Sequence, residues 1–251
     1  MNLLAFDTST DMMSIAVQCT VAGADNTLHT HVFQHTGLGG AQTSAHLIPA
    51  IQNLMSQAGL AFDQLDAIVF GRGPGSFTGL RTACSVAQGL AFGAKVAVLP
   101  IDTLLCVAEE ARFQHAPMQV RFQVIALLDA RMDELYAGCY AFNGGQWTQD
   151  GDCSLTRPED LQLQPESILA GNVFAVYGAR LPTDSNANAE SSFQSGLPRI
   201  EVLPTATALL RLAPALLAAG AAVPADQALP LYIRDKVAKT TAERAADKAV
   251  L

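Results

Sequence analysis

The chain has 251 residues, of which 50% are hydrophobic and 15% are charged, so it has ample apolar material for a core, and disorder over the whole length is excluded. The net charge is −8 at pH 7, and the first lysine or arginine is Arg72. This disfavours direct binding of nucleic acid, because that affinity comes largely from basic side chains that neutralise phosphates. The five cysteines form no C-x-x-C pair, which is typical of free thiols in a reducing compartment.

Neither a signal peptide nor a membrane span is predicted. The best candidate span, 212–225, is too short for the roughly 20 apolar residues that a spanning helix needs. We therefore expect a soluble, cytoplasmic protein with no membrane contact.

The elements predicted along the first part of the chain alternate in a regular order. Apolar and alternating runs predict strands at 2–6, 13–18 and 29–34, and the simplest arrangement of these three is a meander. Helices and strands are then predicted in turn at 43–58 (helix), 67–70 (strand), 78–93 (helix), 96–99 (strand) and 103–113 (helix). The order βββαβαβα indicates an α/β fold with a mixed sheet covered by helices.

The opening pattern then recurs. Leu3–Asp11 and Ile125–Asp133 each contain four apolar residues, an aspartate, three further residues and a second aspartate, at an offset of 122 residues. A second βββ-like stretch follows from residue 124, so we interpret the chain as a duplication. The predicted division is a first lobe at 1–101, a second lobe at 102–204, and a segment 205–233 that returns to the first lobe.

The remaining segments carry weaker signals. Residues 184–196 are polar and predict a surface loop. A helix is predicted at 205–219 with a kink or an interruption at Pro214, and a last strand at 229–233. Residues 234–251 have more basic than acidic side chains and are interpreted as a solvated, charged tail.

Two segments could bind an anion or a cation. Asp7, Thr8 and Ser9 follow the first strand, where hydroxyls can donate to phosphate and a carboxylate can hold a hydrated cation. The alternative is a plain Asx turn. The run Gly71–Arg81 joins a strand to a helix, and its glycines with the helix N-terminus could bind an anion, although the P-loop Lys-Ser/Thr is missing. The alternative is a tight turn in which Ser76 or Thr78 caps the helix.

The helix predicted at 78–93 has a stripe of small residues. Gly79, Ala83, Ala87 and Ala91 recur every four residues, so that another helix could approach closely. The alternative is that both sides of this helix are buried within one chain. His31 and His35 have the H-x-x-x-H spacing, but they lie in or beside the strand predicted at 29–34 and not on a helix, so no helical zinc site is predicted. No G-x-S-x-G is present, so a nucleophile elbow is not predicted either.

Four of these segments together resemble the bacterial TsaB (YeaZ) family: 7–9, 73–81, 129–131 and 231–234. The run Gly73–Arg81, GPGSFTGLR, is the most specific, and the resemblance extends over residues 1 to 236. It implies two ribonuclease-H-like lobes of the actin-like, Hsp70 and sugar-kinase superfamily, the second lobe shortened. It also implies a part in placing a threonylcarbamoyl group on the adenosine next to the anticodon of certain tRNAs.

The resemblance implies further that this chain is an accessory subunit and not the catalyst. The metal-carrying paralogue TsaD performs the transfer and binds this chain directly, the ATPase TsaE joins the complex, TsaC supplies threonylcarbamoyl-AMP, and tRNA is contacted only indirectly. Without TsaD, the same surface forms a homodimer. The interface residues implied on the helix are Thr78, Gly79, Arg81, Thr82, Ala83, Val86, Ala87, Leu90 and Ala91.

Catalytic and metal-binding residues are not expected in this chain, nor is an intrinsic cofactor. A weak, vestigial site for ATP or ADP is expected at a subunit interface, with Asp7, Thr8, Ser9, Gly73 and Gly75 as its residues. Two other functions stay open: an ATPase or kinase of the actin-like superfamily, and a glycoprotease-type metallopeptidase. Nucleotide turnover by the isolated chain would favour the former, and a bound metal with peptide cleavage the latter.

Overall fold

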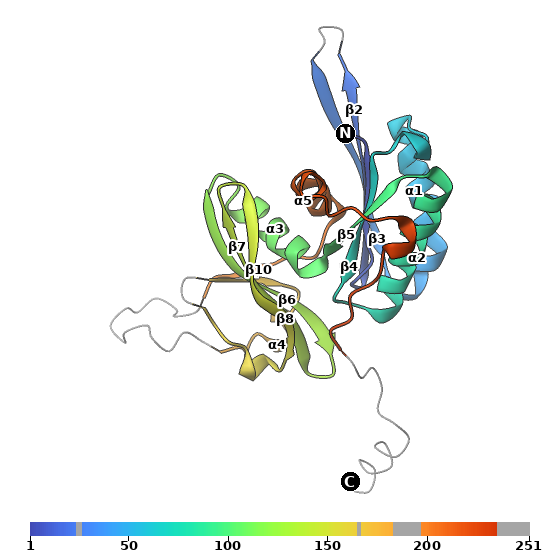
Figure 1. The fold of residues 1–251 in the computed structure, drawn as a ribbon. Helices are drawn as coiled ribbons and strands as arrows, with labels where there is room; N and C mark the ends of the chain where they lie inside the picture. The colour runs from blue at the N-terminus through green and yellow to red at the C-terminus, as the bar shows by residue number, and fades with distance from the viewer. Residues whose placement is uncertain (24–26, 165–166, 183–196, 235–251) are drawn as a thin grey trace, which may run out of the picture.

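Two five-stranded mixed sheets form the centre of the protein in the computed structural model, which describes residues 1–23, 27–164, 167–182 and 197–234 (Figure 1). The first sheet has the strand order β3-β2-β1-β4-β5, and the second has the order β10-β9-β6-β7-β8. The elements up to residue 102 are β1 (Leu3–Asp7), β2 (Met12–Ala22), β3 (Leu28–Leu38), η1 (Gly40–Gln42), α1 (Thr43–Ala58), η2 (Phe62–Gln64), β4 (Ala67–Gly73), α2 (Phe77–Ala94) and β5 (Ala97–Asp102). The later elements are α3 (Thr103–His115), β6 (Arg121–Arg131), β7 (Glu134–Asn143), β8 (Gln146–Thr156), η3 (Pro158–Asp160), β9 (Ile168–Gly171), α4 (Phe174–Tyr177), β10 (Arg199–Glu201), α5 (Ala206–Ala218) and η4 (Ala225–Gln227).

The two sheets have the same topology. In each, three strands form an antiparallel meander, a fourth strand pairs in parallel with the first strand of the meander, and the fifth pairs in parallel with the fourth. The predicted order βββαβαβα and the predicted duplication are therefore confirmed. The second lobe keeps all five strands, but among the described residues only η3 and α4 follow β8 and β9, where the first lobe has the long helices α1 and α2. It is shortened in its helices and in the lengths of β9 and β10, but it keeps the number and order of strands.

Four helices cover the sheets (Figure 1). Helices α1 and α2 pack on the outer face of the first sheet, against side chains such as Phe6 and Ile68. Helix α5 packs on the inner face of that sheet, and α3 packs on the second sheet, so these two helices form a layer between the lobes. Strand β1 is buried on both faces, as is typical of a strand at the centre of a three-layer arrangement.

Of the kink or interruption predicted at Pro214, the interruption is wrong, because α5 runs unbroken from Ala206 to Ala218. Proline in a helix removes one hydrogen bond and costs about 3 kcal/mol. Here Pro214 lies on the exposed side, while Leu209 and Ala213 are buried against the first sheet. Packing of the apolar face therefore keeps the helix intact.

Residues 225–234, here called the strap, begin with η4 and continue without regular secondary structure across α2 to the second lobe (Figure 1). The strand predicted at 229–233 is wrong, because the strap forms no ladder; the Leu231 amide donates to the Arg72 carbonyl, 2.7 Å apart. Pro230 has no amide hydrogen to donate. The strap nevertheless lies on the first lobe, since Gln88 Nε2 on α2 donates to the Ala228 carbonyl at 2.8 Å.

Arg234 corrects the prediction of a tail that begins there. Its side chain is only 11% exposed and forms an ion pair with Glu134 on β7. The rest of the predicted tail, 235–251, and the whole of the predicted loop at 184–196 lie outside the described residues. The lobe boundaries at 101 and 204 stay predictions.

The glycine-rich loop after β4 packs directly against the turn that follows β1. A Cβ atom built at Gly79 would lie 1.9 Å from the Thr8 carbonyl oxygen, and one built at Gly75 would lie 2.6 Å from the Ser9 Cβ. The Ser76 amide donates to the Ser9 carbonyl (2.7 Å), and the Thr8 hydroxyl donates to the Gly79 carbonyl (2.8 Å). These glycines are thus required by close contact between two parts of the same chain.

We predict that Gly79→Ala lowers the free energy of unfolding by at least about 2 kcal/mol, because the new methyl group meets backbone that cannot move aside. Gly89→Ala is the matched control in the same helix. A Cβ there meets nothing within 4 Å, so this change should raise the free energy of unfolding by about 0.5–1 kcal/mol. Urea denaturation of both variants measures the difference, and equal effects would contradict the contact.

Candidate functional site

The turn after β1 is buried and satisfied within the chain. Asp7, Thr8 and Ser9 are at most 3% exposed. Asp7 Oδ1 accepts from the Ser9 amide (2.9 Å) and the Ser9 hydroxyl (2.6 Å), which is the Asx turn considered above. Burial raises the pKa of Asp7 to about 6, although the hydrogen bonds from Ser9 and Thr103 oppose that rise.

The second lobe repeats this turn. Asp129 Oδ1 accepts from the Arg131 amide at 2.7 Å, just as Asp7 accepts from the amide two residues later in the first lobe. Asp129 differs in that its carboxylate also accepts from the Tyr177 hydroxyl (3.2 Å) and from the Arg131 guanidinium (3.2 Å). The repeated aspartates therefore build the same local structure, but only the second one pairs with a basic side chain.

Between the lobes lies a cavity of about 490 Å³, here called the interlobe cleft. Arg131 from the second lobe reaches across it and binds Asp11 of the first lobe, with 2.6 Å between Nη2 and Oδ2. Arg131, Met132 and Asp133 all have positive φ, near 60°, which is rare for residues with side chains and shows that this turn is held by its contacts. The cleft is lined from three parts of the chain. The first lobe contributes residues 9–11, 74–77 and 80, the second lobe contributes 128–132, 136, 172 and 176, and the strap contributes 231–234.

Two of the five residues predicted to bind a nucleotide line this cleft, namely Ser9 and Gly75. Asp7, Thr8 and Gly73 do not. Gly73 instead faces the strap, since a Cβ built there would lie 2.6 Å from the Leu231 carbonyl oxygen. The prediction of a nucleotide site itself stays untested, but the cleft is built mainly from other residues.

Helix α2 corrects the sequence interpretation of its small-residue stripe. Ala83, Ala87 and Ala91 are at most 1% exposed and belong to the core on the outer face of the first sheet, while Gly79 lies on the Thr8 carbonyl. The alternative of burial within the chain holds for this stripe. The alternative of a Ser76 cap holds too, because its hydroxyl accepts from the Gly79 amide at 3.5 Å.

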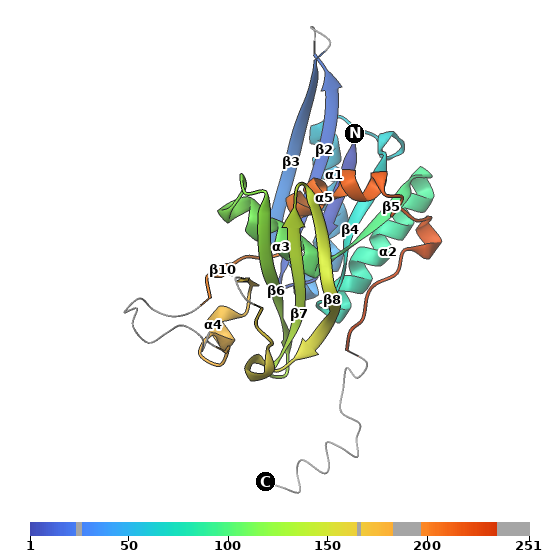
Figure 2. The same ribbon diagram turned by 60° about the vertical axis from the view of Figure 1, so that its left-hand side comes forward.

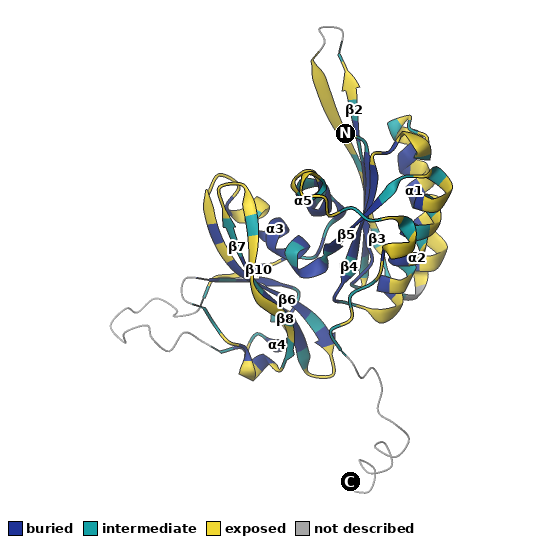
Figure 3. Ribbon diagram, in the orientation of Figure 1, coloured by how far each residue is buried: buried dark blue, intermediate teal, exposed yellow. Residues whose placement is uncertain are grey.

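The opposite side of α2 is the exposed one (Figure 3). It has its own run of small residues, Ser85, Gly89 and Gly93, with Phe92 beside them at 83% exposure. Of the residues predicted at the interface, Thr78 and Arg81 are exposed, while Thr82, Val86 and Leu90 are half-buried. We call this surface, 82–93 on its solvent side, the α2 face; from Thr82 to Ala94 the helix carries no charged residue.

The N-terminal end of α2 is covered by the strap. The Arg81 guanidinium lies 3.8 Å from the centre of the Phe77 ring, and its Nε donates to the Tyr232 hydroxyl at 3.0 Å. The Phe77 and Tyr232 rings are themselves 5.4 Å apart. Arg81 is therefore engaged within the chain, and the α2 face begins beyond it.

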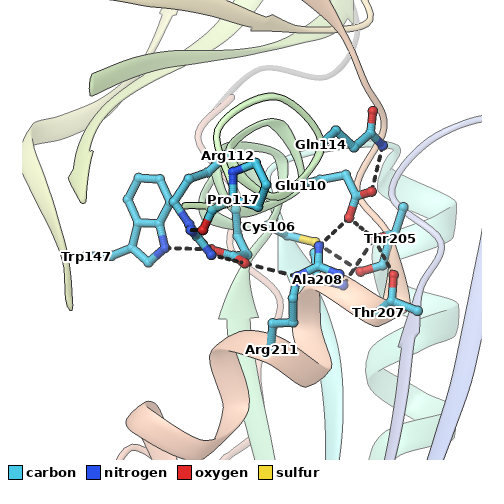
Figure 4. Close-up of polar contacts among 11 residues, drawn as sticks. Cys106, Glu110, Arg112, Gln114, Pro117, Trp147, Thr205, Thr207, Ala208 and Arg211 are labelled. Atoms are coloured by element: carbon cyan, nitrogen blue, oxygen red, sulfur yellow. Dashed lines mark hydrogen bonds and ion pairs between the residues drawn. The ribbon is translucent and has the colours of Figure 1, made fainter. Parts of the chain in front are cut away.

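A charged network joins α3 and α5, and sequence reasoning missed it (Figure 4). Glu109 and Glu110 are buried, and Arg211 of α5 pairs with both. Arg112 and Trp147 donate to Glu109, each at 3.0 Å. Two consecutive glutamates amid the apolar residues of 104–111 were the signal, since buried carboxylates need partners.

Two features are absent from the described ranges. Within them, no three histidine, cysteine or acidic side chains come together in a way that could hold a metal ion. None of the helices described there is long and apolar enough to cross a membrane.

The comparisons with known proteins agree with one another. Residues 39–242 match the family model described as TsaD, tRNA N6-adenosine threonylcarbamoyltransferase. The chain is 30% identical to the tRNA threonylcarbamoyladenosine biosynthesis protein TsaB of Escherichia coli, over 95% of this chain and 96% of that one. It is 40% identical to the TsaB of Haemophilus influenzae over 54% of this chain and 52% of that one.

A solved structure extends the likeness to the fold. YeaZ from Pseudomonas aeruginosa superposes with a TM-score of 0.74 at 34% identity, over 92% of this chain and 99% of that one. The resemblance stated from the four sequence segments and the expected class of two actin-like, ribonuclease-H-like lobes are both confirmed. The chain belongs to the TsaB (YeaZ) family of tRNA threonylcarbamoyladenosine biosynthesis proteins.

Proposed function

We propose that this chain is a non-catalytic subunit that binds a TsaD-type tRNA threonylcarbamoyltransferase through the α2 face and supports the transfer that TsaD performs. The observation that carries the proposal is the α2 face itself: small and apolar residues, with Phe92 83% exposed, on a helix whose other side is fixed in the core. Exposed glycines let a partner backbone approach closely, and an exposed aromatic ring is a common anchor in interfaces. When TsaD is absent, the same face supports a homodimer.

The other partners follow from this arrangement. TsaE joins through the assembled complex, and tRNA is bound by the complex and not by this chain, because a net charge of −8 opposes phosphate binding. This is supported by the absence of any charged residue on α2 beyond Arg81, which leaves that surface without a footprint for nucleic acid.

We propose too that Asp7, Thr8 and Ser9 have a structural role here, and that ATP or ADP is held only weakly, at a subunit interface. The Asp7 carboxylate and the Thr8 hydroxyl are occupied by Ser9 and Gly79 and do not line the interlobe cleft. Both groups are buried and bonded within the chain, so neither is presented to a phosphate or a hydrated cation. Catalysis by this chain alone is therefore not proposed.

The interface is tested by Gly89→Arg. The substitution adds a bulky cation to the centre of the α2 face, and we predict that affinity for the TsaD partner falls at least 30-fold, the equivalent of about 2 kcal/mol. The fold should persist, because a side chain at Gly89 points into open space. Calorimetry with the purified partner measures the loss, and the melting temperature checks the fold.

Gln146→Arg is the control, since it adds the same charge at an exposed position on the edge of the second sheet. It should leave the affinity unchanged. Wild-type affinity in the Gly89→Arg variant would remove the α2 face from the interface and leave the proposal without its main support.

The role of Asp7 is tested by Asp7→Asn, measured as a function of pH. The raised pKa of Asp7, about 6, means that the folded protein holds a proton that the unfolded chain releases near pH 4. The free energy of unfolding should therefore fall by roughly 3 kcal/mol as the pH rises from about 4 to about 6, because Asp7 becomes ionised in a buried site. The Asp7→Asn variant has no carboxylate to ionise at this position and should not show this fall. Urea denaturation of both proteins from about pH 4 to about pH 8 gives the difference.

The same variant separates the functional alternatives. With a structural Asp7, the assembled complex should transfer threonylcarbamoyl at nearly the wild-type rate. A loss of several orders of magnitude in a variant that is folded and still binds its partner would instead assign Asp7 to the chemistry.

A further inference from the structure

Strand β3 is the outermost strand of the first sheet and half of a long hairpin that projects from the body of the protein (Figure 2). It pairs with β2 over eleven consecutive positions, from Leu28 opposite Ala22 to Leu38 opposite Met12, with no bulge. Nearly all of its residues are exposed, including Leu28 at 73% and Leu38 at 65%. It is a long, regular edge whose outer side is not paired with any described strand.

This edge lacks the protection that edge strands normally carry. Proteins block unwanted strand pairing with charged side chains, prolines and bulges. Neither Met12–Ala22 nor Leu28–Leu38 contains a single charged residue or proline. The corresponding edge strand of the second lobe, β8, has Asp150 and Asp152 and an irregular register. One chain thus protects one of two equivalent edges and leaves the other open.

The sequence of β3 is nearly the same when it is read outward in either direction from Phe33. Leucine stands five residues away on both sides, threonine three away and histidine two away: Leu28 and Leu38, Thr30 and Thr36, His31 and His35. Two identical strands that pair antiparallel about a two-fold axis at Phe33 would place each residue opposite its counterpart. Identical Thr–Thr and aromatic pairs are favourable across antiparallel strands, and no like charges meet.

We propose that β3 pairs edge to edge with β3 of a second copy of this chain, antiparallel and centred on Phe33, so that the two first sheets become one continuous sheet. The register of β3 with β2 shows which residues share a face. Phe33, His31 and His35 lie on the face that α1 covers, and Leu28, Thr30 and Val32 lie on the other. Across the axis, His29 would cover Gly37 of the second copy, and aromatic side chains are suited to cover a glycine in this way.

This interface is separate from the α2 face and does not depend on the proposed function. Helix α2 packs over β4, whereas β3 lies at the far edge of the sheet, beyond β2 and β1. A chain could therefore hold a TsaD partner on α2 and a second copy on β3 at the same time. Each interface can be removed without touching the other.

Sedimentation velocity over a range of concentrations tests the proposal in the Gly89→Arg background, where association through α2 is blocked. We expect a dimer there, and we expect Val32→Lys to raise its dissociation constant at least tenfold, since a charge on an edge strand prevents pairing. Val120→Lys is the control, because Val120 is 70% exposed just before β6. A monomer in the Gly89→Arg background, or a dimer that Val32→Lys leaves intact, would overturn the proposal.

The register is tested by disulfide formation. Thr30→Cys with Thr36→Cys places two thiols opposite one another across the axis, within the Cβ separation of about 4.5–5.5 Å of facing residues. Mild oxidation should give a covalent dimer. The control is Thr30→Cys with Gln34→Cys, which also adds two exposed thiols but places them out of register, so it should stay monomeric on a non-reducing gel. Covalent dimers from both double variants, or from neither, would contradict the proposed register. If the protein is monomeric in both the sedimentation and the oxidation experiments, the proposal of a second copy is overturned, and the partner of β3 would be an extended segment of a different protein.

Discussion

The contact between the glycine-rich loop and the turn after β1 determines which groups of the first lobe are buried and which side of α2 faces solvent. With no side chains at Gly75 and Gly79, α2 begins directly on the backbone of Thr8 and Ser9. That contact buries the Asp7 carboxylate and commits the Thr8 hydroxyl to the helix. It also fixes the rotation of α2, so that Ala83 and Ala87 face the sheet and Gly89 faces solvent. A loop that resembles an anion site is thereby used for packing.

The two repeated turns show how a duplication can diverge in chemistry while it keeps its geometry. Asp7 and Asp129 each accept from the amide two residues later. Asp7 is enclosed, and burial raises its pKa, whereas Asp129 is bonded to Arg131 at the edge of the cleft. Removal from water disfavours the charged form of a carboxylate, which is the cause of the raised pKa of Asp7. The first turn has become part of the core, and the second retains a charged surface.

The sequence predicted elements well and their orientation poorly. Helix α1 was placed at its observed bounds, since apolar spacing marks its body and Gly59 ends it in the left-handed conformation. The four-residue spacing on α2 correctly grouped Ala83, Ala87 and Ala91 on one side, but such spacing cannot say whether that side faces the sheet or a partner. Small residues suit both. The lining of the cleft was only partly predicted, because it brings together residues 9–11, 128–132 and 231–234 from distant parts of the sequence, and no local pattern reports such a meeting.

The relation between the lobes depends on the helix layer more than on the visible bridge across the cleft. Arg131 and Asp11 are 67% and 80% exposed, and an ion pair in water contributes about 0–1 kcal/mol. Glu109, Glu110 and Arg211 are largely enclosed between α3 and α5, where removal of one partner costs about 3–5 kcal/mol. A molecule that entered the cleft would displace only the weaker pair. A ligand shifts a conformational equilibrium only by the difference between its binding free energies for the two conformations. Breaking the weaker pair alone supplies little such difference, so a ligand in the cleft would move the lobes little. The α2 face begins beyond the first turn of α2, where Phe77 and Leu80 line the cleft, and the core beneath the helix sets the geometry of that face. Such a surface is ready for a partner whether or not the cleft is filled.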